Sequence, residues 1–468
     1  MEIDADVVVV GGGPGGSAVS TLIAGQGHRV LLLEKEHFPR YQIGESLLPA
    51  TVHGIGRLLG VSQTLAEAGF MPKRGGTFQW GEKPEPWTFA FAASDVFSGP
   101  TSTAYQVERM KFDQILLDNA RDKGVEVREG ARVEDVLDSG GRIGGVVYTD
   151  EDGVRTTVRS RFVIDASGST SAIRDRVGGS RRYSEFFRNL ALFGYFEGGA
   201  RLPEPNSGNI LCAAFDAGWF WYIPLTATLT SVGAVLRPDA LDLARGDKER
   251  ALTGLIDRCP LIAQHLAHAR RVDSGPYGEI RVRKDYSYDR DRFWRHGMVL
   301  IGDAACFIDP VFSSGVHLAT YSALLAARSI NTVLSGEDPD EDSCFAEFAA
   351  RYRREYSVFH DFLVSFYDLH QDHESYFWKA KKVTSNNASP LQSFAELVGG
   401  GASRETGLVD AGGYADAPLF GSEAVETLLE EGAKIQVQAV LGNIADEEPI
   451  RDGGLVPSTD GMHWTWPS

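Results

Sequence analysis

The chain has few cysteines, no excess of basic residues and no long apolar run, and each shortage excludes a class of protein. Four cysteines are scattered among 468 residues without a CxxC pair: Cys212, Cys259, Cys306 and Cys344. This excludes a zinc-like spacing and fits free thiols in a reducing compartment. Acidic residues outnumber basic ones, 64 to 46, which gives a formal net charge of −18. Because nucleic acids and anionic membrane surfaces are polyanions, neither is expected as a partner.

The sequence also has no apolar stretch long enough to span a bilayer, and no basic-then-apolar segment at its start. We therefore expect a cytoplasmic protein without membrane attachment, and no metal site. Its 43% hydrophobic and 24% charged residues are typical of globular domains. The length allows two or three domains or one elaborated core.

The first residues have the pattern of a dinucleotide-binding βαβ unit. The apolar run Asp6–Val10 leads into GGGPGG, residues 11–16, and a second apolar run ends on Glu34. The spacing GxGxxG between a strand and a helix lets backbone N–H groups approach a pyrophosphate. A carboxylate about twenty residues further on can hold ribose hydroxyls. The expected binding residues are Gly11, Gly13, Pro14, Gly16 and Glu34.

The rest of the chain suggests two further parts. Aromatic-rich, alternating runs between about 184 and 284 predict a mostly antiparallel sheet inserted into the nucleotide-binding fold. After Ala319 the pattern turns helical, with a further helix expected over Ala424–Leu441 in a glycine-rich, acidic tail. We expect a core domain over 1–335 and a mostly helical C-terminal domain over 336–468. The ending His463–Trp466 either anchors the tail or frays.

Three motifs identify the dinucleotide as FAD by resemblance. GDAA (Gly302–Ala305) is similar to the GD motif of FAD-dependent monooxygenases of the para-hydroxybenzoate hydroxylase type, in which the aspartate, here Asp303, contacts the ribityl chain. Arg109, in RMKFD, matches that family's arginine near the flavin, and Asp165–Gly168 resembles its third flavin-contacting turn. The resemblance implies an α/β FAD-dependent monooxygenase-like fold, with a Rossmann-like FAD domain, an inserted sheet and a helical C-terminal region. A single nucleotide fingerprint leaves room for a separate NAD(P)H-dependent flavin reductase.

Two stretches narrow the reaction. In GWFWYIPLT, residues 218–226, the segment WxWxIP fits flavin-dependent halogenases. Lys73, in KRGG, matches their catalytic lysine, and FIDPVFSSGVHL (307–318) resembles their flavin-and-halide loop. The resemblance implies that Pro310 and Gly315 contact the flavin. It also implies that the halide, chloride or bromide, lies by Ser313, Ser314 and Gly315, whose backbone N–H groups suit an anion.

The likeness covers almost the whole chain, including FPRYQIGESLLPATVHG (38–54), VRKDYSY (282–288) and GGLVPSTDGMHW (453–464). It is strongest to the halogenases of glycopeptide-antibiotic biosynthesis, the vancomycin and teicoplanin type. These chlorinate tyrosine or β-hydroxytyrosine held as a thioester on a peptidyl carrier protein of a nonribosomal peptide synthetase. Such a partner, together with a flavin reductase, O₂ and chloride, is therefore implied for this chain.

The resemblance also implies a route for the chlorine. Reduced flavin and O₂ give a C4a-hydroperoxide, chloride attacks it, and the resulting hypochlorous acid travels to Lys73. There it is either hydrogen-bonded or forms a chloramine, which a desolvated lysine favours because it loses its proton readily. Arg74 is a weaker candidate because a guanidinium stays charged. Trp219, Trp221 and Pro224 form a barrier between flavin and substrate, unless the tryptophans merely fill an interface and Lys73 is a solvated surface residue.

One position departs from the family. Halogenases of free tryptophan have a glutamate before the serine/threonine-glycine turn, and Phe312 stands here instead. A glutamate-assisted mechanism is not carried over, and free tryptophan is disfavoured as substrate. A base that removes the phenolic proton would make the ring carbon more nucleophilic. The sequence does not rank the candidates for this base, which are His317, His360, Asp361 and Glu374.

Docking of an acidic carrier protein would need a basic patch. The candidates are Arg351, Arg353 and Arg354, or Lys379, Lys381 and Lys382, and each group fits a solvated helix face equally well. Two other functions remain open. One is an aromatic hydroxylase of the same fold, which would add oxygen instead of chlorine. The other is a non-catalytic flavoprotein that recruits a synthetase.

Overall fold

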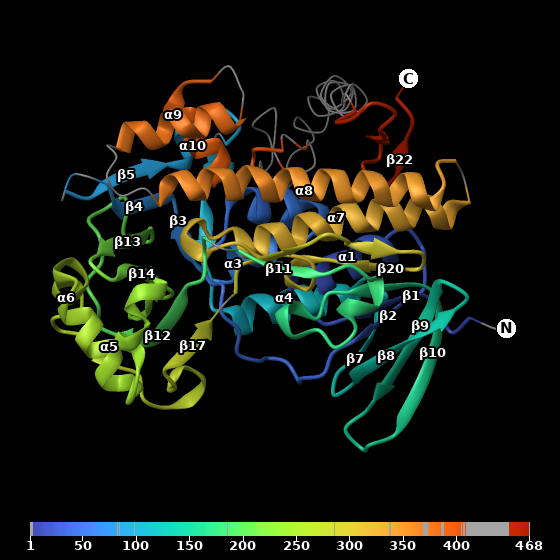
Figure 1. Cartoon of the computed structure of the whole chain (residues 1–468), viewed down its shortest axis with the longest axis horizontal. Coiled ribbons are helices and arrows are strands. Elements are labelled where there is room, and N and C mark those ends of the chain that lie inside the picture. Colours follow the sequence, from blue (N-terminus) through green and yellow to red (C-terminus); the bar gives the residue numbers. More distant parts are fainter. Residues whose placement is uncertain are drawn as a thin grey trace, which may run out of the picture.

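The computed structural model describes residues 3–408 and 449–467, apart from 82, 84, 98, 185, 285, 337, 368–372, 385–387, 404, 406 and 407. Two sheets lie at opposite ends of the molecule, and two long helices, α7 (Ser314–Ser335) and α8 (Glu341–Phe366), run across it (Figure 1). The helix predicted over 424–441 lies outside the described residues. Within the described part, no helix has the length and apolar character needed to cross a membrane.

The first sheet is the nucleotide-binding one. Its central strands β1 (Ala5–Val10) and β10 (Arg155–Asp165) pair in parallel, and the buried apolar run of β1 lies against the buried end of β10. The order is β19-β20-β10-β1-β2-β7, and a β8–β9 hairpin continues from β10. The remaining strands are β2 (Val30–Leu33), β7 (Glu126–Arg128), β8 (Arg132–Ser139), β9 (Arg142–Thr149), β19 (Trp294–Arg295) and β20 (Met298–Leu300). The helices beside this sheet are α1 (Pro14–Ala24), α4 (Arg109–Asp122) and α7.

The second sheet contains the predicted insertion. Its order is β16-β12-β15-β14-β13-β4-β5, with β17 pairing β12, and its pairs are antiparallel except β13–β4. The strands are β4 (Gly75–Gln79), β5 (Trp87–Ala90), β12 (Leu190–Glu197), β13 (Ile210–Phe215), β14 (Gly218–Pro224), β15 (Leu229–Leu236), β16 (Arg270–Arg271) and β17 (Arg281–Lys284). The sheet is therefore larger than the expected insertion, because β4 and β5 come from before it. Helices α5 (Lys248–Asp257) and α6 (Pro260–His265) lie beside it (Figure 1).

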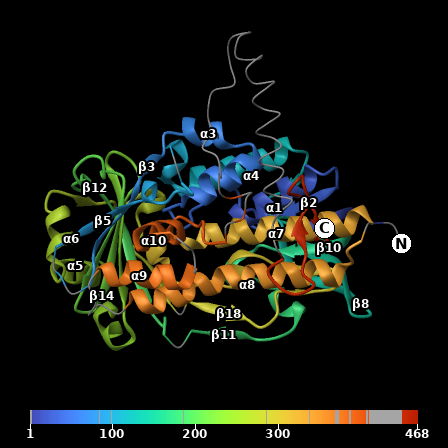
Figure 2. The ribbon, with the colours of Figure 1, turned by 90° about the horizontal axis from the view of Figure 1, so that it is seen from above.

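Seen from above, α8 lies alongside α7, with α9 (His373–Thr384) and α10 (Pro390–Val398) over the end of the second sheet (Figure 2). A capping box on Ser389 starts α10. Strands β11 (Arg181–Tyr183) and β18 (Tyr288–Arg290) pair with each other next to α8. Because α8 packs along α7 of the core, the division into domains at 335/336 stays a proposal.

The C-terminal residues are anchored rather than frayed. Trp464 is buried, donates from Nε1 to Ser329 Oγ at 2.9 Å, and lies beneath the guanidinium groups of Arg328 and Arg351. Both arginines face the buried carboxylate of Glu405, at 2.9 and 3.7 Å. Arg351 is thus committed to an internal ion cluster, which corrects its assignment to a docking patch.

Candidate active site

The glycine loop after β1 has no room for side chains. Gly11 has φ +103°, and a Cβ there would lie 2.6 Å from the carbonyl oxygen of Ala166. A Cβ at Gly16 would lie 1.9 Å from the carbonyl oxygen of Gly11. Helix α1 starts at Pro14 with no side chain capping it at Gly13, so its first N–H groups remain available for an anion. The loop therefore fits the pyrophosphate of FAD.

Two charged side chains border this loop. Glu34 is buried, and its carboxylate accepts from the backbone N–H of Gly12 at 2.7 Å and of Glu36 at 2.9 Å. These bonds fix the carboxylate at the end of β2, with lone pairs left for ribose hydroxyls. The sequence analysis missed Arg40, whose Nη2 would lie 3.4 Å from a Cβ at Gly13. A guanidinium so placed suits a pyrophosphate.

The other two predicted flavin turns reach the same place. Ala166 packs against Gly11, as described above, so the Asp165–Gly168 turn adjoins the glycine loop. Gly302 has φ +55°, and a Cβ there would lie 3.0 Å from Ala319 on α7. Burial raises the pKa of Asp303 to about 6, against the opposing effect of Arg109 and Arg181. Arg109 therefore lies within charge range of the GD aspartate.

Arg109 is the first residue of α4 and is held rigidly. Its Nε and Nη2 donate to both oxygens of Asp113, at 2.7 and 2.9 Å, and its Nη1 donates to the carbonyl of Ile43 at 2.5 Å. The fully buried Asp113 also accepts from Arg40 at 2.9 Å. One carboxylate thus joins the predicted flavin arginine to the arginine at the glycine loop.

The predicted halide turn is strained. Ser313 has φ +61°, the one positive φ of a non-glycine residue in the described ranges. The turn joins a short 3₁₀ segment, Pro310–Phe312, to the N-terminus of the 22-residue α7. Strain of this kind persists where the surroundings impose it, typically at functional sites. It aims the N–H groups at the start of a long helix away from the chain, which suits an anion.

The two tryptophans share one face of β14, because alternate residues of a strand point the same way. Trp219 and Trp221 are 2% and 5% exposed and belong to the core shared with the nucleotide-binding sheet. Their intervening Phe220 belongs to the separate core under α5 and α6. Pro224 ends the strand. The indoles thus lie between the two sheets, where a barrier would stand.

Lys73 is not a surface lysine. At the end of β3 (Met71–Lys73) it is 3% exposed, and its ammonium donates to the carbonyl of Leu47 at 3.0 Å and lies 5.5 Å from the ring centre of Phe91. Burial lowers the pKa of Lys73 to about 7, although the neighbouring thiol of Cys212 opposes the shift. A neutral amine is therefore accessible near neutral pH. By contrast, Arg74 reaches the carbonyl of Pro205 in an exposed contact.

The segment Gly44–Leu47 connects these parts. A Cβ at Gly44, whose φ is +102°, would lie 2.9 Å from Arg109 Nη1 and 4.0 Å from Val316, which follows Gly315. Three residues later, Leu47 accepts from Lys73. The segment therefore runs from the predicted flavin and halide residues to the lysine.

Phe312 sits at the centre of an aromatic cluster. Its ring lies 4.6 Å from that of Phe366, 5.2 Å from that of Phe362 and 6.0 Å from that of Phe78. These rings come from α8 and β4, and α10 adds Phe394 at 6.1 Å. No carboxylate occupies the position of the family's glutamate.

The candidates for a base that removes the phenolic proton differ in burial and in their partners. His317 is fully buried and pairs with Glu355 at 2.7 Å, and His360 contacts its neighbour Asp361 at 3.1 Å. The side chain of Glu374 lies outside the description. A further buried group is Tyr367, at the end of α8, which accepts from Trp219 Nε1 at 2.8 Å. Its hydroxyl also bonds the carboxylate of Asp309, so α8 is tied to the tryptophan face.

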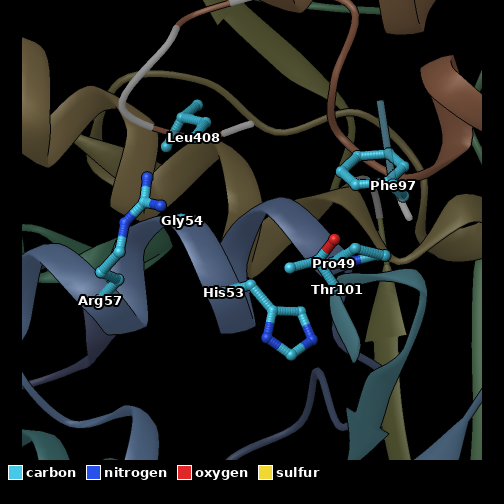
Figure 3. Close-up of a pocket in the computed structure, with 7 residues that line it drawn as sticks. All are labelled: Pro49, His53, Gly54, Arg57, Phe97, Thr101 and Leu408. Atoms are coloured by element: carbon cyan, nitrogen blue, oxygen red, sulfur yellow. The ribbon is translucent and has the colours of Figure 1, made fainter. Parts of the chain in front are cut away.

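A small cavity lies near the lysine strand (Figure 3). It encloses about 240 Å³, open solvent included, and is lined by Pro49, His53, Gly54, Arg57, Phe97, Thr101 and Leu408. His53 Nε2 contacts the carbonyl of Thr103 at 2.8 Å. Thr103 precedes Ala104, the β-partner of Lys73. The cavity therefore borders the strand pair that carries the lysine.

Several known proteins are similar to this chain in sequence and in fold. The family model described as tryptophan halogenase matches residues 6–99 and 93–411. A tryptophan 2-halogenase from Chondromyces crocatus is 33% identical over 443 residues, covering 93% of this chain and 82% of that protein. The structure of the myxobacterial chondrochloren halogenase CndH, a variant of FAD-dependent halogenases, is 52% identical with a TM-score of 0.79, covering 98% of this chain and 99% of that one. CmlS, a flavin-dependent halogenase, is 32% identical with a TM-score of 0.73, covering 99% and 84%.

These matches extend over nearly the whole chain and confirm the expected FAD-dependent monooxygenase-like fold. They equally establish FAD as the cofactor, with O₂ and a halide as co-substrates. They do not single out the glycopeptide branch, since the relatives include a tryptophan 2-halogenase. The chain belongs to the flavin-dependent halogenases of the tryptophan halogenase family.

Proposed function

We propose that this halogenase chlorinates the phenol ring of a tyrosyl or β-hydroxytyrosyl group tethered to a peptidyl carrier protein, with Lys73 as the residue that presents the chlorine. The observation that carries the proposal is the setting of Lys73: a buried ammonium whose hydrogen bond goes to a backbone carbonyl, at the end of the segment that starts beside Arg109. No carboxylate pairs with it among the described residues. Such an amine exchanges its proton near neutral pH.

The cofactor site would be formed by Gly11, Gly13, Pro14, Gly16, Glu34, Arg109, Asp303, Pro310 and Gly315. When bound and reduced by a separate NAD(P)H-dependent reductase, FAD supplies the electrons that convert O₂ and chloride into hypochlorous acid. The N-terminus of α7, with Ser313, Ser314 and Gly315, would hold the chloride by its dipole and by the N–H groups of Ser314 and Gly315. The N–H of Ser313 donates to the carbonyl of Pro310 at 2.9 Å. The closeness of Arg109 to Asp303 and to Gly44 supports a flavin ring at this position.

Lys73 then directs the chlorine in one of two ways. As an ammonium it donates a hydrogen bond to hypochlorous acid, which makes the chlorine more electrophilic. As an amine it attacks the chlorine, releases water and becomes a chloramine, from which the ring carbon takes the chlorine and returns the proton. Burial favours the second route because it favours the neutral amine.

The tryptophan face supports separation of substrate from flavin. Trp219 and Trp221 fill the space between the two sheets, their ring centres 6.2 Å apart, and each indole N–H is satisfied. An aromatic substrate kept behind them cannot take oxygen directly. Only a small oxidant such as hypochlorous acid would reach the substrate from the flavin. This favours chlorination, because direct hydroxylation needs the substrate beside the flavin.

The surroundings of Phe312 support a phenol over free tryptophan. Aromatic rings surround Phe312 at the position where halogenases of free tryptophan have their glutamate, so that glutamate is not available to assist an unactivated indole carbon. A phenol supplies its own activation, since loss of its proton enriches the ortho carbon. Because one relative is named tryptophan 2-halogenase, free tryptophan is the alternative substrate that the assay must include.

A surface strip beside the tryptophans supports a tethered substrate. Phe186 is 50% exposed and its ring lies 6.0 Å from that of Tyr367, the hydrogen-bond partner of Trp219. Tyr183 is also exposed, and the strip continues past Arg353 and Arg354 on α8. Exposed aromatics with arginines suit an acidic carrier protein. The glutamate variants Arg353→Glu and Arg354→Glu should weaken carrier binding, and Arg245→Glu, in an exposed ion pair elsewhere, should not.

The test uses purified protein with FAD, a flavin reductase, NADH, O₂ and chloride. Tyrosine, β-hydroxytyrosine and tryptophan are offered free, and the first two also loaded on a carrier, with product masses read. We expect chlorine on carrier-loaded phenols and its loss in Lys73→Ala. Lys111→Ala is the matched control, because Lys111 likewise donates to a carbonyl and lies 5.6 Å from a phenylalanine ring, but at the surface. Oxygen without chlorine would establish a hydroxylase instead, and chlorinated free tryptophan would overturn the substrate assignment.

A further inference from the structure

A buried carboxyl group lies between the flavin residues and Lys73 without a role so far. Glu45 is 2% exposed, and its Oε1 accepts from the hydroxyl of Tyr195 at 2.8 Å. That hydroxyl is 2.7 Å from the hydroxyl of Tyr41. The other carboxyl oxygen, Oε2, is buried and has no hydrogen-bond partner among the described residues. A buried polar atom left open in this way indicates a partner that the protein itself does not supply.

The position of Glu45 points to the flavin. It follows Gly44, which lies against Arg109 Nη1 and close to Val316 at the start of α7. On its other side, the hydroxyl of Ser231 interacts with the carboxyl group and also accepts from Trp221 Nε1 at 3.2 Å. Glu45 is therefore enclosed by the predicted flavin arginine, the predicted halide turn and the tryptophan face.

Its surroundings favour a carboxyl group that binds and releases a proton near neutrality. Burial raises the pKa of Glu45 to about 7, more than the nearby hydroxyl of Ser231, the hydrogen bond from Tyr195 and the charge of Arg109 lower it. The nearby Glu108 raises it further. These groups lie on β15, on β12 and at the start of α4.

The two tyrosines lead outward. Tyr195 is fully buried on β12, whereas Tyr41 is only partly buried, and the guanidinium of Arg281 stacks on its ring at 3.7 Å. Tyr277 flanks both rings and donates to the partly buried Glu108 at 3.2 Å. Hydroxyl groups in contact can each accept one proton and pass on another, so this chain joins the carboxyl group to the protein surface.

Halogenation consumes a proton at the flavin. Reduced flavin, O₂, chloride and one proton give oxidised flavin, hypochlorous acid and water: the flavin loses two electrons, chloride loses two, and O₂ gains four. One oxygen of O₂ leaves in hypochlorous acid and the other as water. We propose that Glu45 donates the proton to the oxygen that leaves as water, and that Tyr195 and Tyr41 re-protonate Glu45 from solvent. The proposal rests on the halogenase chemistry of the family, and not on Lys73 or the carrier protein.

The variant Glu45→Gln keeps the shape of the side chain and removes the acid. We expect hypochlorous acid formation, measured with a small soluble trap and no aromatic substrate, to fall about 100-fold, within the usual range for general acid catalysis. Hydrogen peroxide should rise in its place, because O₂ that does not oxidise chloride takes only the two electrons of the flavin and leaves with both oxygens as H₂O₂. Lys111→Ala, a change at a surface lysine, should leave both quantities unchanged. Because this assay contains no aromatic substrate and no carrier protein, failure of this proposal and failure of the proposed function are distinguishable.

A second measurement uses the protein without FAD. Infrared difference spectra between pH 8 and pH 6 should contain the carbonyl stretch of a protonated, buried carboxylic acid, and Glu45→Gln should lack it. If Glu45 is only structural, Glu45→Gln and Glu45→Asp will alter thermal stability or FAD affinity together with the rate. We expect FAD affinity to stay within a few-fold in Glu45→Gln, and Glu45→Asp to restore part of the hypochlorous acid yield.

The tyrosines are tested by Tyr195→Phe and Tyr41→Phe, which break the path without removing the acid. Both should slow repeated turnover and raise the solvent deuterium isotope effect, with the larger change in Tyr195→Phe. Tyr222→Phe is the matched control: Tyr222 lies on β14, which β15 separates from β12, it faces the opposite side of the sheet, and it donates to the carbonyl of Ala200 at 2.8 Å. Unchanged yields of hypochlorous acid and peroxide in Glu45→Gln, or equal effects of all three tyrosine variants, would overturn the proposal.

Discussion

The ammonium of Lys73 is bonded to the carbonyl of Leu47, two residues after the buried carboxyl group of Glu45. The short segment Gly44–Leu47 therefore carries the carboxyl group of Glu45 and also binds the ammonium of Lys73, and both groups have pKa values near neutrality. A shift of this segment at Gly44, where it packs against Arg109, would also displace the carbonyl of Leu47 to which Lys73 is bonded. The backbone of this segment therefore connects the predicted flavin residues to the lysine proposed to present the chlorine.

Lys73 should make the protein less stable at low pH. The folded pKa is lowered to about 7 from 10.5, so between these values the unfolded chain binds more protons than the folded one. Stability from this group is full above the unfolded pKa and is lost as pH falls through the folded one. Lys73→Met should therefore raise the melting temperature more at pH 6.5 than at pH 10. Between these two pH values, its effect on the free energy of unfolding should differ by at most about 4 kcal/mol.

Thermal melts across this pH range measure the difference. Lys111→Met is the control, because its ammonium is at the surface, and its effect should be small and nearly independent of pH. A constant effect of Lys73→Met across the range would show that its ammonium stays charged in the folded protein.

A methyl group at Gly16 should abolish FAD binding. The Cβ of alanine would lie 1.9 Å from the carbonyl oxygen of Gly11, so the turn that presents the N–H groups must open. We expect FAD affinity, measured by flavin fluorescence, to fall by at least about 100-fold, equivalent to ~3 kcal/mol. Gly27→Ala, which would meet nothing within 4 Å, should bind FAD normally. Normal binding by Gly16→Ala would place the pyrophosphate elsewhere.

The hydroxyl of Tyr367 should matter to stability more than its exposure suggests. Tyr367→Phe leaves the indole N–H of the buried Trp219 without its acceptor, at a cost of about 1–3 kcal/mol. Urea unfolding measures the change. Tyr148→Phe removes an acceptor from Arg128, which still reaches Glu126, and should cost less than about 1 kcal/mol. Similar losses in both variants would argue that the contact at Trp219 has no special weight.

The sequence motifs predicted the parts of this site that depend on local geometry. GxGxxG, GD and WxWxIP each set a turn or a strand face within a few residues, and the structure places them in adjoining positions. The expected sheet was found as well, but the prediction had left out its strands β4 and β5. These strands join it through a parallel pairing with β13, far along the chain, and short strands carry little signal for so distant a partner.

Single polar residues escaped prediction for a related reason. Arg40 and Glu45 belong to no spaced motif, and their meaning comes from partners that are distant in sequence: Asp113 for the one and Tyr195 for the other. Likewise, the basic run around Arg351 reads as a surface helix until Glu405 is seen beside it. A charge on a helix is assigned to solvent by default, and only burial reveals the exception. The only hint in the sequence was the stretch FPRYQIGES (38–46), which contains both residues.

The ion cluster that anchors the C-terminal residues provides the last prediction. Glu405 is fully buried between Arg328 and Arg351. Burial alone would raise its pKa, but the two arginines outweigh burial and lower it. The stability that this carboxylate contributes is therefore present above its unfolded pKa and lost as pH falls through the folded value.

Glu405→Gln should destabilise the protein by about 3–5 kcal/mol, because the buried guanidinium of Arg328 loses its carboxylate partner. Arg351 keeps its pair with Glu347 at 2.7 Å. Glu197→Gln, which breaks an exposed pair with Arg270, should cost at most about 1 kcal/mol. Denaturant unfolding at pH 7 compares the two variants. The deficit of Glu405→Gln should shrink as the pH is lowered, because the wild-type carboxylate then loses its own charge. Equal costs for the two variants would mean that water reaches the cluster and that Trp464 anchors the tail by packing alone.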